Sequence, residues 1–356
     1  MSSSNCRSLM GIMAFSAIML GGCNSASEDV IEQGTTSKGA EAIAKAAIHA
    51  GMDLSMFVKD AFTEAPKIVD CETSNGTKTT CYQLLTSGAP AGRVPGPFCP
   101  RTISDGADVG GGWFNKDGSG DLVDITGEFI LKLGDYYGDE KWLLYDAKTK
   151  KIRYTATKAA CLGAARPDVE EQYKQNCIEC ELAYLDDDFS RTFLIPTTPI
   201  PAAKTGRVHT VGIALDGSEL SGPAPVDVIL GAYTIAAFDD CGGHINVHQG
   251  YHYHSTTGCT DASVKTDDGH APLIGYAADG YGIYAMKNAE GKEVELLDEC
   301  RGISDEIRGY HYHAASPSEN MFIGCFHGET VRSADGPPGG PPGGPERPQA
   351  DHDAAK

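Results

Sequence analysis

The chain has 356 residues, with 49 acidic residues against 29 lysines and arginines, and a formal net charge of −20. This balance excludes nucleic acid and anionic lipid as electrostatic partners, because like charges repel and no basic patch compensates. It is compatible with cations, neutral glycans or basic proteins, and equally with solubility in a salty medium.

The first residues have the pattern of an export signal. The apolar run Leu9–Leu20 is too short to span a bilayer and suits the core of a signal peptide. Residues 20–23, Leu-Gly-Gly-Cys, match the lipobox of bacterial lipoproteins, although an ordinary secretory peptide is the alternative. We therefore expect cleavage after residues 1–22 and a lipid on Cys23 that anchors the chain to the membrane. Asn24, in place of an aspartate retention signal, favours the outer membrane of the cell envelope.

Two segments of different composition follow the predicted anchor. Residues 23–38 are polar and resemble a linker. From Lys38 to Phe62 the chain is alanine-rich, and its larger apolar residues recur at near-helical spacing. We expect one or two helices here, within a helical segment at residues 39–66. The spaced apolar residues are Ile43, Ala47, Met52 and Met56.

Beyond Lys67 the sequence predicts short strands and tight turns. Ser74-Asn75-Gly76-Thr77 lies between two strand-like runs, so we expect a hairpin that sets Cys71 opposite Cys81. Asp216-Gly217 and Asp279-Gly280 are predicted turns, and a helix is possible at Val169–Leu182. The other expected strands are Trp142–Tyr145, Ile152–Thr155, Val208–Leu215, Ile229–Phe238, Leu273–Ala277 and Gly282–Met286.

These patterns predict a mainly β fold: a disulfide-stapled β-rich domain with a short N-terminal helical segment. We expect a β-rich N-terminal part at residues 67–205 and a second part at residues 206–335 that contains an internal duplication. Residues 336–356 repeat Pro-Pro-Gly-Gly and lack apolar anchors, which predicts a disordered Pro/Gly tail.

Ten cysteines lie beyond Cys23, an even number that predicts about five disulfides in an exported chain. An oxidising compartment also disfavours zinc sites made of cysteine. Cys177-Ile178-Glu179-Cys180 has the spacing of a redox motif, but no thioredoxin-like pattern flanks it, so we expect a structural role.

The most informative feature is an element that occurs twice, separated by 59 residues. Asp239 and Asp298 open the two copies, and Gly-Tyr-His-Tyr-His follows at 250–254 and 309–313. A Gly-Cys pair closes each copy. Agreement at so many offsets indicates one supersecondary unit used twice. We expect disulfides Cys241–Cys259 and Cys300–Cys325 to close the two units.

The alternation of this element favours a metal site. Successive side chains of a strand point to opposite faces, so His252 and His254 share one face, as do His311 and His313. Imidazoles at this spacing suit zinc or copper, whereas structural or acid–base histidines are the simpler interpretation. The tyrosines take the other face, where they can pack or support the site. These tyrosines are Tyr251, Tyr253, Tyr310 and Tyr312.

The two copies differ in their remaining histidines. Where the first has His244 and His248, the second has isoleucines, which excludes two independent four-histidine sites. Either the two His-x-His pairs meet in one shared site, which we favour, or the first copy binds and the second supports it. His244, His248, His270 or His327 would supply a further ligand or supporting contact. Asp239 and Asp298 could orient an imidazole or cap a turn.

The region from about Val208 to Gly328 resembles the YHYH domain family. The resemblance rests on several motifs in the same order, with Gly282 in place of an expected proline and Arg301 in place of an expected asparagine. It implies a secreted or surface location. The motifs are residues 239–244, both Tyr-His-Tyr-His copies, and residues 270–276, 279–284 and 297–300.

Three functions agree with these patterns, and whether the protein is an enzyme is open. The first is a surface lipoprotein that binds zinc or copper, either to store or handle the metal or to use it in catalysis. The second is a metal-free enzyme acting on polysaccharide through histidine and tyrosine as acid and base. The third is a non-catalytic adhesive or glycan-binding module, in which tyrosines stack on the ligand. The expected partners are a metal ion and the membrane through Cys23, with a glycan under the second and third functions and no nucleic acid.

Overall fold

The computed structural model of the protein describes residues 51–116, 120–206, 208, 210–261 and 268–331. The predicted signal peptide, the lipidated Cys23, the linker and the Pro/Gly tail lie outside these residues. In the described part of the chain no helix has both the length and the apolar character needed to cross a membrane.

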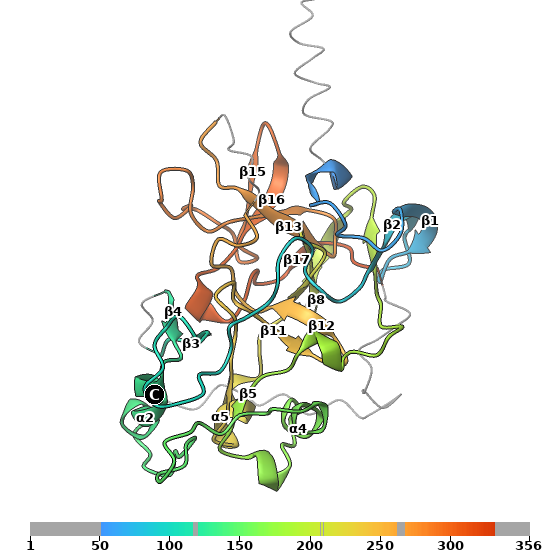
Figure 1. The fold of residues 1–356 in the computed structure, drawn as a ribbon. Helices are drawn as coiled ribbons and strands as arrows, with labels where there is room; N and C mark the ends of the chain where they lie inside the picture. Colours follow the sequence, from blue (N-terminus) through green and yellow to red (C-terminus); the bar gives the residue numbers. More distant parts are fainter. Residues whose placement is uncertain (1–50, 117–119, 207, 209, 262–267, 332–356) are drawn as a thin grey trace, which may run out of the picture. The chain divides into compact units, whose positions relative to one another are not determined.

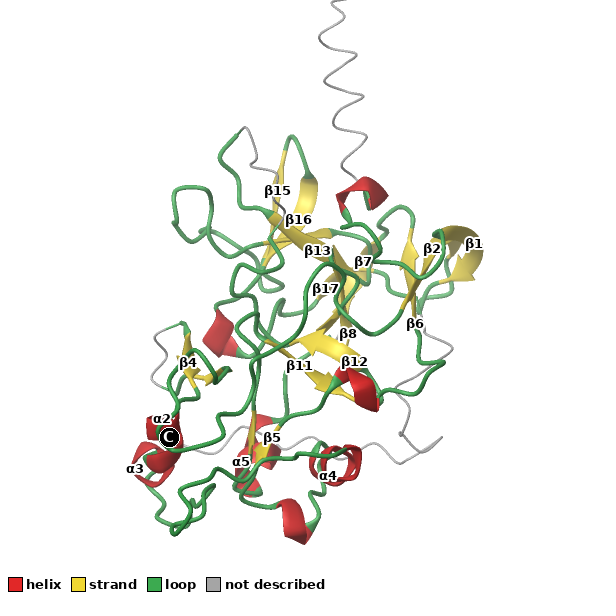
Figure 2. Cartoon of the chain, viewed as in Figure 1, coloured by secondary structure: helices red, strands yellow, loops and turns green. Residues whose placement is uncertain are grey.

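The fold is mainly β, as the sequence predicts, and its α-helices are short (Figures 1 and 2). The strands are β1 Lys67–Glu72, β2 Lys78–Thr86, β3 Gly112–Phe114, β4 Leu122–Asp124, β5 Cys177–Ile178, β6 Arg191–Pro196, β7 Pro201–Gly206, β8 Thr210–Ala214, β9 Glu219–Ser221, β10 Ile235–Ala236, β11 Gly243–Asn246, β12 Gly250–Tyr253, β13 Leu273–Ala277, β14 Gly282–Tyr284, β15 Gly302–Asp305, β16 Gly309–His313 and β17 Phe326–Gly328. The α-helices are α2 Gly127–Leu131, α3 Leu133–Tyr137, α4 Lys158–Ala164 and α5 Val226–Gly231, and the 3-10 helices are η1 Leu54–Met56, η2 Glu171–Tyr173, η3 Leu182–Tyr184 and η4 Pro317–Glu319.

An eight-stranded sheet, in the order β11-β12-β9-β8-β13-β14-β16-β15, holds both duplicated elements. Its halves have the same topology. Each half begins with an antiparallel hairpin, β8–β9 in the first and β13–β14 in the second. The second strand of the hairpin pairs in parallel with the histidine strand, β12 or β16. The histidine strand then pairs antiparallel with the edge strand, β11 or β15. The antiparallel pair β8–β13 joins the halves, so equivalent strands meet at a pseudo-twofold axis. The duplication therefore extends upstream of the repeat recognised in the sequence, into these hairpins.

The two hairpins turn where the sequence predicts, at Asp-Gly pairs. Gly217 and Gly280 have φ of +84° and +91°, a region that costs glycine little and other residues more. A Cβ on Gly217 would also lie 2.4 Å from the Ala61 carbonyl oxygen. These turns bring Asp216 and Asp279 to equivalent positions beside the histidine strands.

Five disulfides form among the described residues, the number that the sequence predicts. Cys71–Cys81 links the β1–β2 hairpin as expected, but the strand register sets Val69, not Cys71, opposite Cys81. Cys177 pairs with Cys99, and Cys180 pairs with Cys161. The two cysteines of the redox-like spacing thus join different segments, which confirms their structural role.

Two predicted elements are wrong. Residues 229–238 were expected as a strand, but α5 covers Val226–Gly231 and only Ile235–Ala236 is extended. An apolar run does not by itself distinguish helix from strand, and here Ile229 and Leu230 pack on one buried cluster while Val228 is exposed. The helix predicted at Val169–Leu182 is replaced by η2 and β5, and disulfides tie Cys177 and Cys180 of this segment to two different parts of the chain.

Other expected elements are only partly regular. The predicted strands Trp142–Tyr145 and Ile152–Thr155 are reduced to isolated bridges, one between Tyr145 and Ile152 and one between Tyr154 and Cys177. Of the predicted helical segment, the described part beginning at residue 51 has a single 3-10 turn, η1. Its backbone bonds instead to distant strands and loops, since Val58 N donates to Leu215 O and Thr63 N to Leu85 O. Such tertiary hydrogen bonds replace those within a helix.

The buried core crosses the boundary expected at residue 205. One cluster packs Trp113 and Ile178 against Ile235 and Phe238, which come from opposite sides of that boundary. A second cluster, beneath the eight-stranded sheet, contains the buried tyrosines of both duplicated elements. The sheet therefore has a hydrophobic core on its tyrosine side.

Candidate metal centres

Strand alternation separates the histidines from the tyrosines as the sequence predicts. The ring centroids of His252 on β12 and of His254 directly after it lie 5.0 Å apart, and those of Tyr251 and Tyr253 also lie 5.0 Å apart. On β16 the corresponding distances are 5.2 Å and 5.3 Å. Each strand thus carries one imidazole face and one phenol face.

The first cluster consists of His244, His252 and His254. His244 lies opposite His252 in the antiparallel pair β11–β12, and their Nε2 atoms are 3.0 Å apart. Each of the three residues offers one nitrogen within 4.8 Å of the other two. His252 and His254 are buried, with 2% and 7% of their surface exposed.

The second cluster consists of His270, His311 and His313. The Nε2 atoms of His270 and His311 are 3.1 Å apart, and the three ligand nitrogens again lie within 4.8 Å of one another. His311 and His313 are 2% and 0% exposed. The buried Nε2 of His313 has no hydrogen-bond partner.

The shared site that we favoured is therefore wrong. Four strands separate β12 from β16 in the sheet, which at about 4.8 Å per step places the clusters on the order of 20 Å apart. The pseudo-twofold axis at β8–β13 causes this separation, because it puts equivalent strands near opposite edges. The alternative of one binding copy and one supporting copy also fails, since each copy builds a cluster of its own.

The third histidine of each cluster comes from a different place. In the first copy it is His244 on β11, where the second copy has Ile303. In the second copy it is His270, three residues before the start of β13, which we expected as a further ligand or a supporting contact. The third histidine thus comes from positions that are not equivalent in the two copies, although the His-x-His pairs are equivalent. The sequence signal for His270 was its presence in a motif shared with the YHYH family.

Backbone carbonyls fix the orientation of five of these rings. A carbonyl oxygen can only accept, so each Nδ1 that contacts one carries the hydrogen, and the lone pair of the neutral ring is on Nε2. These contacts are His252 to Gly250 O at 3.1 Å, His254 to Gly222 O at 2.9 Å, His311 to Gly309 O at 2.9 Å, His313 to Ala285 O at 2.9 Å and His270 to Ala271 O at 2.9 Å.

The close Nε2 pairs fit a metal ion. Two lone pairs that face each other at 3.0–3.1 Å repel unless a proton or a cation lies between them. Zinc–nitrogen bonds of about 2.0–2.1 Å in tetrahedral geometry place the two nitrogens about 3.3 Å apart. The spacing in both clusters is close to this value.

Burial keeps the imidazoles neutral. Desolvation lowers the pKa of His252 to about 4, of His254 to about 3 and of His313 to about 4. It likewise lowers the pKa of His244, His270 and His311. A neutral imidazole is the form that binds a metal, so the clusters are ready to bind near neutral pH.

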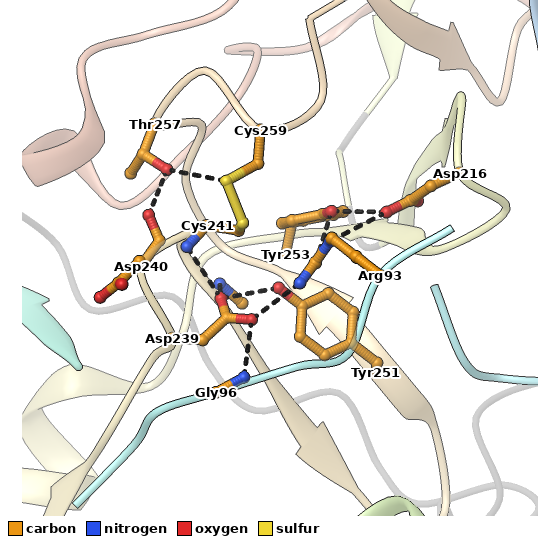
Figure 3. The surroundings of a disulfide bond; sticks show 11 residues. Arg93, Gly96, Asp216, Asp239, Asp240, Cys241, Tyr251, Tyr253, Thr257 and Cys259 are labelled. Carbon is orange, nitrogen blue, oxygen red and sulfur yellow. Dashed lines mark hydrogen bonds and ion pairs between the residues drawn. A yellow bond between two sulfur atoms is a disulfide. The ribbon is translucent and has the colours of Figure 1, made fainter. Parts of the chain in front are cut away.

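The tyrosine face of β12 is a buried polar network (Figure 3). The Tyr251 hydroxyl donates to Asp239 at 2.8 Å, and that of Tyr253 donates to Asp216 at 2.6 Å. Arg93 pairs with Asp239 at 3.0 Å and donates to the Tyr253 hydroxyl at 2.7 Å. Asp239 also accepts the N–H groups of the following turn, at Cys241 and Gly243, so it caps this turn and holds a tyrosine rather than an imidazole.

The second copy repeats this network without an arginine. Tyr310 donates to Asp298 at 2.9 Å, and Tyr312 donates to Asp279 at 2.5 Å. The rings of His327 and Tyr310 stack with their centroids 3.8 Å apart. In the first copy the Arg93 guanidinium takes the same place, 4.5 Å from the ring centroid of Tyr251. His327 therefore belongs to the tyrosine face and not to the second cluster.

The remaining predictions concern the turns. The disulfides Cys241–Cys259 and Cys300–Cys325 form as expected and close equivalent segments. His248, a predicted ligand, is exposed between β11 and β12 and is outside the first cluster.

Fold and site together define a disulfide-linked β protein whose duplicated sheet carries paired three-histidine clusters. Residues 192–321 match the model of the YHYH protein family, which confirms the resemblance over the stretch that contains both clusters. No curated protein and no solved structure matches the chain.

Proposed function

We propose that the protein binds two transition-metal ions, zinc or copper, one at each three-histidine cluster. The observation that carries this proposal is the convergence of three buried imidazole nitrogens in each copy, with five of the six rings oriented by backbone carbonyls. Recruitment of His244 and His270 from unrelated positions supports it further, because packing alone does not demand a third imidazole in both copies.

The donor set favours these metals over others. Three neutral nitrogens suit zinc or copper, whereas calcium and magnesium prefer oxygen ligands. With three protein ligands a bound zinc would keep one position for water and lower the pKa of that water towards neutrality, which is the route to a metalloenzyme.

The tyrosine-based alternatives lose support from the site geometry. Tyr251, Tyr253 and Tyr312 are fully buried and bond to aspartates, so their rings do not offer a stacking surface to a glycan. The same hydroxyls lie on the face opposite the imidazoles, away from the histidines with which an acid–base pair would have to work.

We also propose that a lipid on Cys23 holds the protein at the outer membrane. This part of the proposal rests on the apolar leader and the Leu-Gly-Gly-Cys sequence at residues 20–23. The wealth of disulfides supports an oxidising compartment.

Metal analysis of chelator-washed protein, reloaded with zinc or copper and desalted, tests the metal proposal. We expect about two tightly bound equivalents in the wild type and one in the His252→Ala/His254→Ala or the His311→Ala/His313→Ala variant. The variant with all four substitutions should bind none. His248→Ala, at an exposed histidine, is the matched control and should keep both ions. Unchanged metal content in the fourfold variant would exclude the proposal.

A further inference from the structure

The two clusters differ in what covers them. Phe238, which is fully buried, lies over the first cluster with its ring centroid 5.1 Å from that of His244 and 5.7 Å from that of His254. It packs in turn on Trp113 and Phe114, at 5.5 Å and 4.9 Å. Aromatic packing of this kind excludes water from the first cluster.

At the second cluster the covering ring is Tyr284, whose centroid lies 4.7 Å from that of His270, 5.1 Å from that of His311 and 6.0 Å from that of His313. The position equivalent to Phe238 is Leu297, which is partly exposed, and its neighbour Leu296 is 92% exposed. The segment that closes the first cluster therefore does not pack into the core in the second copy.

A cavity of about 550 Å³ adjoins the second cluster instead. His270 lines it directly, and so does Ala285, whose carbonyl oxygen orients His313. Thr256 and Asp261, from the loop that follows β12 in the first copy, form part of its wall. The volume falls within the range of about 300–1,000 Å³ typical of small-molecule sites.

Carboxylates of Asp121 and Asp261 and the hydroxyl group of Thr256 lie in the wall of this cavity, together with Lys287 and Asn288. The carboxylates complement N–H or O–H groups of a ligand. A metal ion at the end of the cavity would add a position for an oxygen or nitrogen donor.

We propose that the metal at the second cluster has an open coordination position on this cavity, where it takes a small oxygen- or nitrogen-donor ligand that carries hydrogen-bond donors. The first cluster is closed and its metal is structural. This inference rests on the proposed function, since it requires a metal at both clusters.

Azide binding to the cobalt(II)-loaded full-length protein in detergent tests the difference in access. Azide should change the visible absorption of one of the two bound cobalt ions. The His311→Ala/His313→Ala variant should keep one cobalt and lose at least 90% of this response, whereas the His252→Ala/His254→Ala variant should keep it all. A response from both ions, from neither, or from the first cluster alone would overturn the inference.

These outcomes separate the two proposals. If no cobalt binds, the proposed function itself fails. If two ions bind and neither takes azide, the metal function stands and only the open position is excluded.

Acetohydroxamate tests the wall, because it supplies oxygen donors together with N–H and O–H groups. In Asp261→Ala its dissociation constant should rise about three- to tenfold, while that of azide, which brings no comparable donors, should change less than twofold. Glu290→Ala, at an exposed acidic residue outside the cavity lining, should change neither value. Equal changes for both probes, or none, would overturn the assigned ligand class.

Discussion

Each cluster brings neutral nitrogen donors together inside the protein, an arrangement that costs free energy unless something binds them. In the first cluster the Nε2 atoms of His244 and His252 lie 3.0 Å apart, so a proton or a cation must lie between them. In the second, the buried His313 Nε2 is unpaired. A buried polar atom without a partner costs about 1–3 kcal/mol, so a bound cation would relieve a cost that the metal-free fold carries.

Replacing His244 by isoleucine, the residue of the second copy, should remove one ligand of the first cluster without a charge change. We expect the affinity of this cluster to fall by more than about 100-fold, since loss of a supporting residue alone costs 10–100-fold. Competition with a chromophoric chelator measures this. His248→Ile on the adjoining turn is the control. Two tight sites in His244→Ile would contradict the assignment of His244 as a ligand.

Acid should destabilise the metal-free protein through the same histidines. Their pKa is lowered on folding, so the unfolded chain binds more protons below its pKa of about 6.5. The stability they confer is therefore present above about pH 6.5 and is lost as the pH falls towards 4. For His252, with a folded pKa of about 4, the loss approaches roughly 3 kcal/mol.

Urea denaturation of chelated protein between pH 7.5 and 4.5 measures this loss. The His252→Asn/His254→Asn variant should show a shallower slope over the same interval. An equal slope in both proteins would mean that other groups dominate the acid response.

At the scale of elements, each repeat consists of one two-stranded hairpin, a histidine strand and an edge strand. The edge strands β11 and β15 are each preceded by a disulfide-closed turn. Since β11 carries His244, the Cys241–Cys259 bond acts on the first cluster through the edge strand.

Removing this bond in Cys241→Ser/Cys259→Ser should lower the free energy of unfolding by about 3 kcal/mol, as expected for a closed loop of 18 residues. It should also weaken metal binding at the first cluster alone. Cys300→Ser/Cys325→Ser is the matched variant, with similar destabilisation and with the second cluster affected instead. A change below about 0.5 kcal/mol in both variants would show that the disulfides contribute little.

Local patterns predicted some elements well. The Asp-Gly pairs predicted both central turns correctly, and the strand predicted at Leu273–Ala277 is β13 with the same bounds. Alternation placed His252 and His254 on one face, because it depends only on strand geometry. Residues 229–238 were mistaken for a strand because an apolar run fits a buried helix equally well.

Long-range geometry was not accessible in this way. Whether two repeats meet or diverge depends on the pairing of β8 with β13, which no local pattern specifies. The same limit explains His270: it lies 41 residues from His311 in the sequence, and only the sheet brings them together.

At the scale of the whole molecule, the predicted lipid on Cys23 would determine where the metal centres work. Cys23→Ser should abolish incorporation of labelled palmitate and move the protein from the membrane fraction to the soluble fraction of the envelope, since no second anchor is predicted. Metal content per folded chain should stay unchanged, because the residue lies far upstream of the sheet in the sequence. Continued membrane association of Cys23→Ser would contradict the anchor.

The central claim is that one chain holds two separate metal ions, and anomalous scattering from a crystal of zinc- or copper-loaded protein tests it most directly. We predict two peaks, one within about 2.0–2.1 Å of the ligand nitrogens of His244, His252 and His254, and one equally close to those of His270, His311 and His313. The absence of a peak from both clusters, in crystals grown with excess metal at neutral pH, would contradict the account.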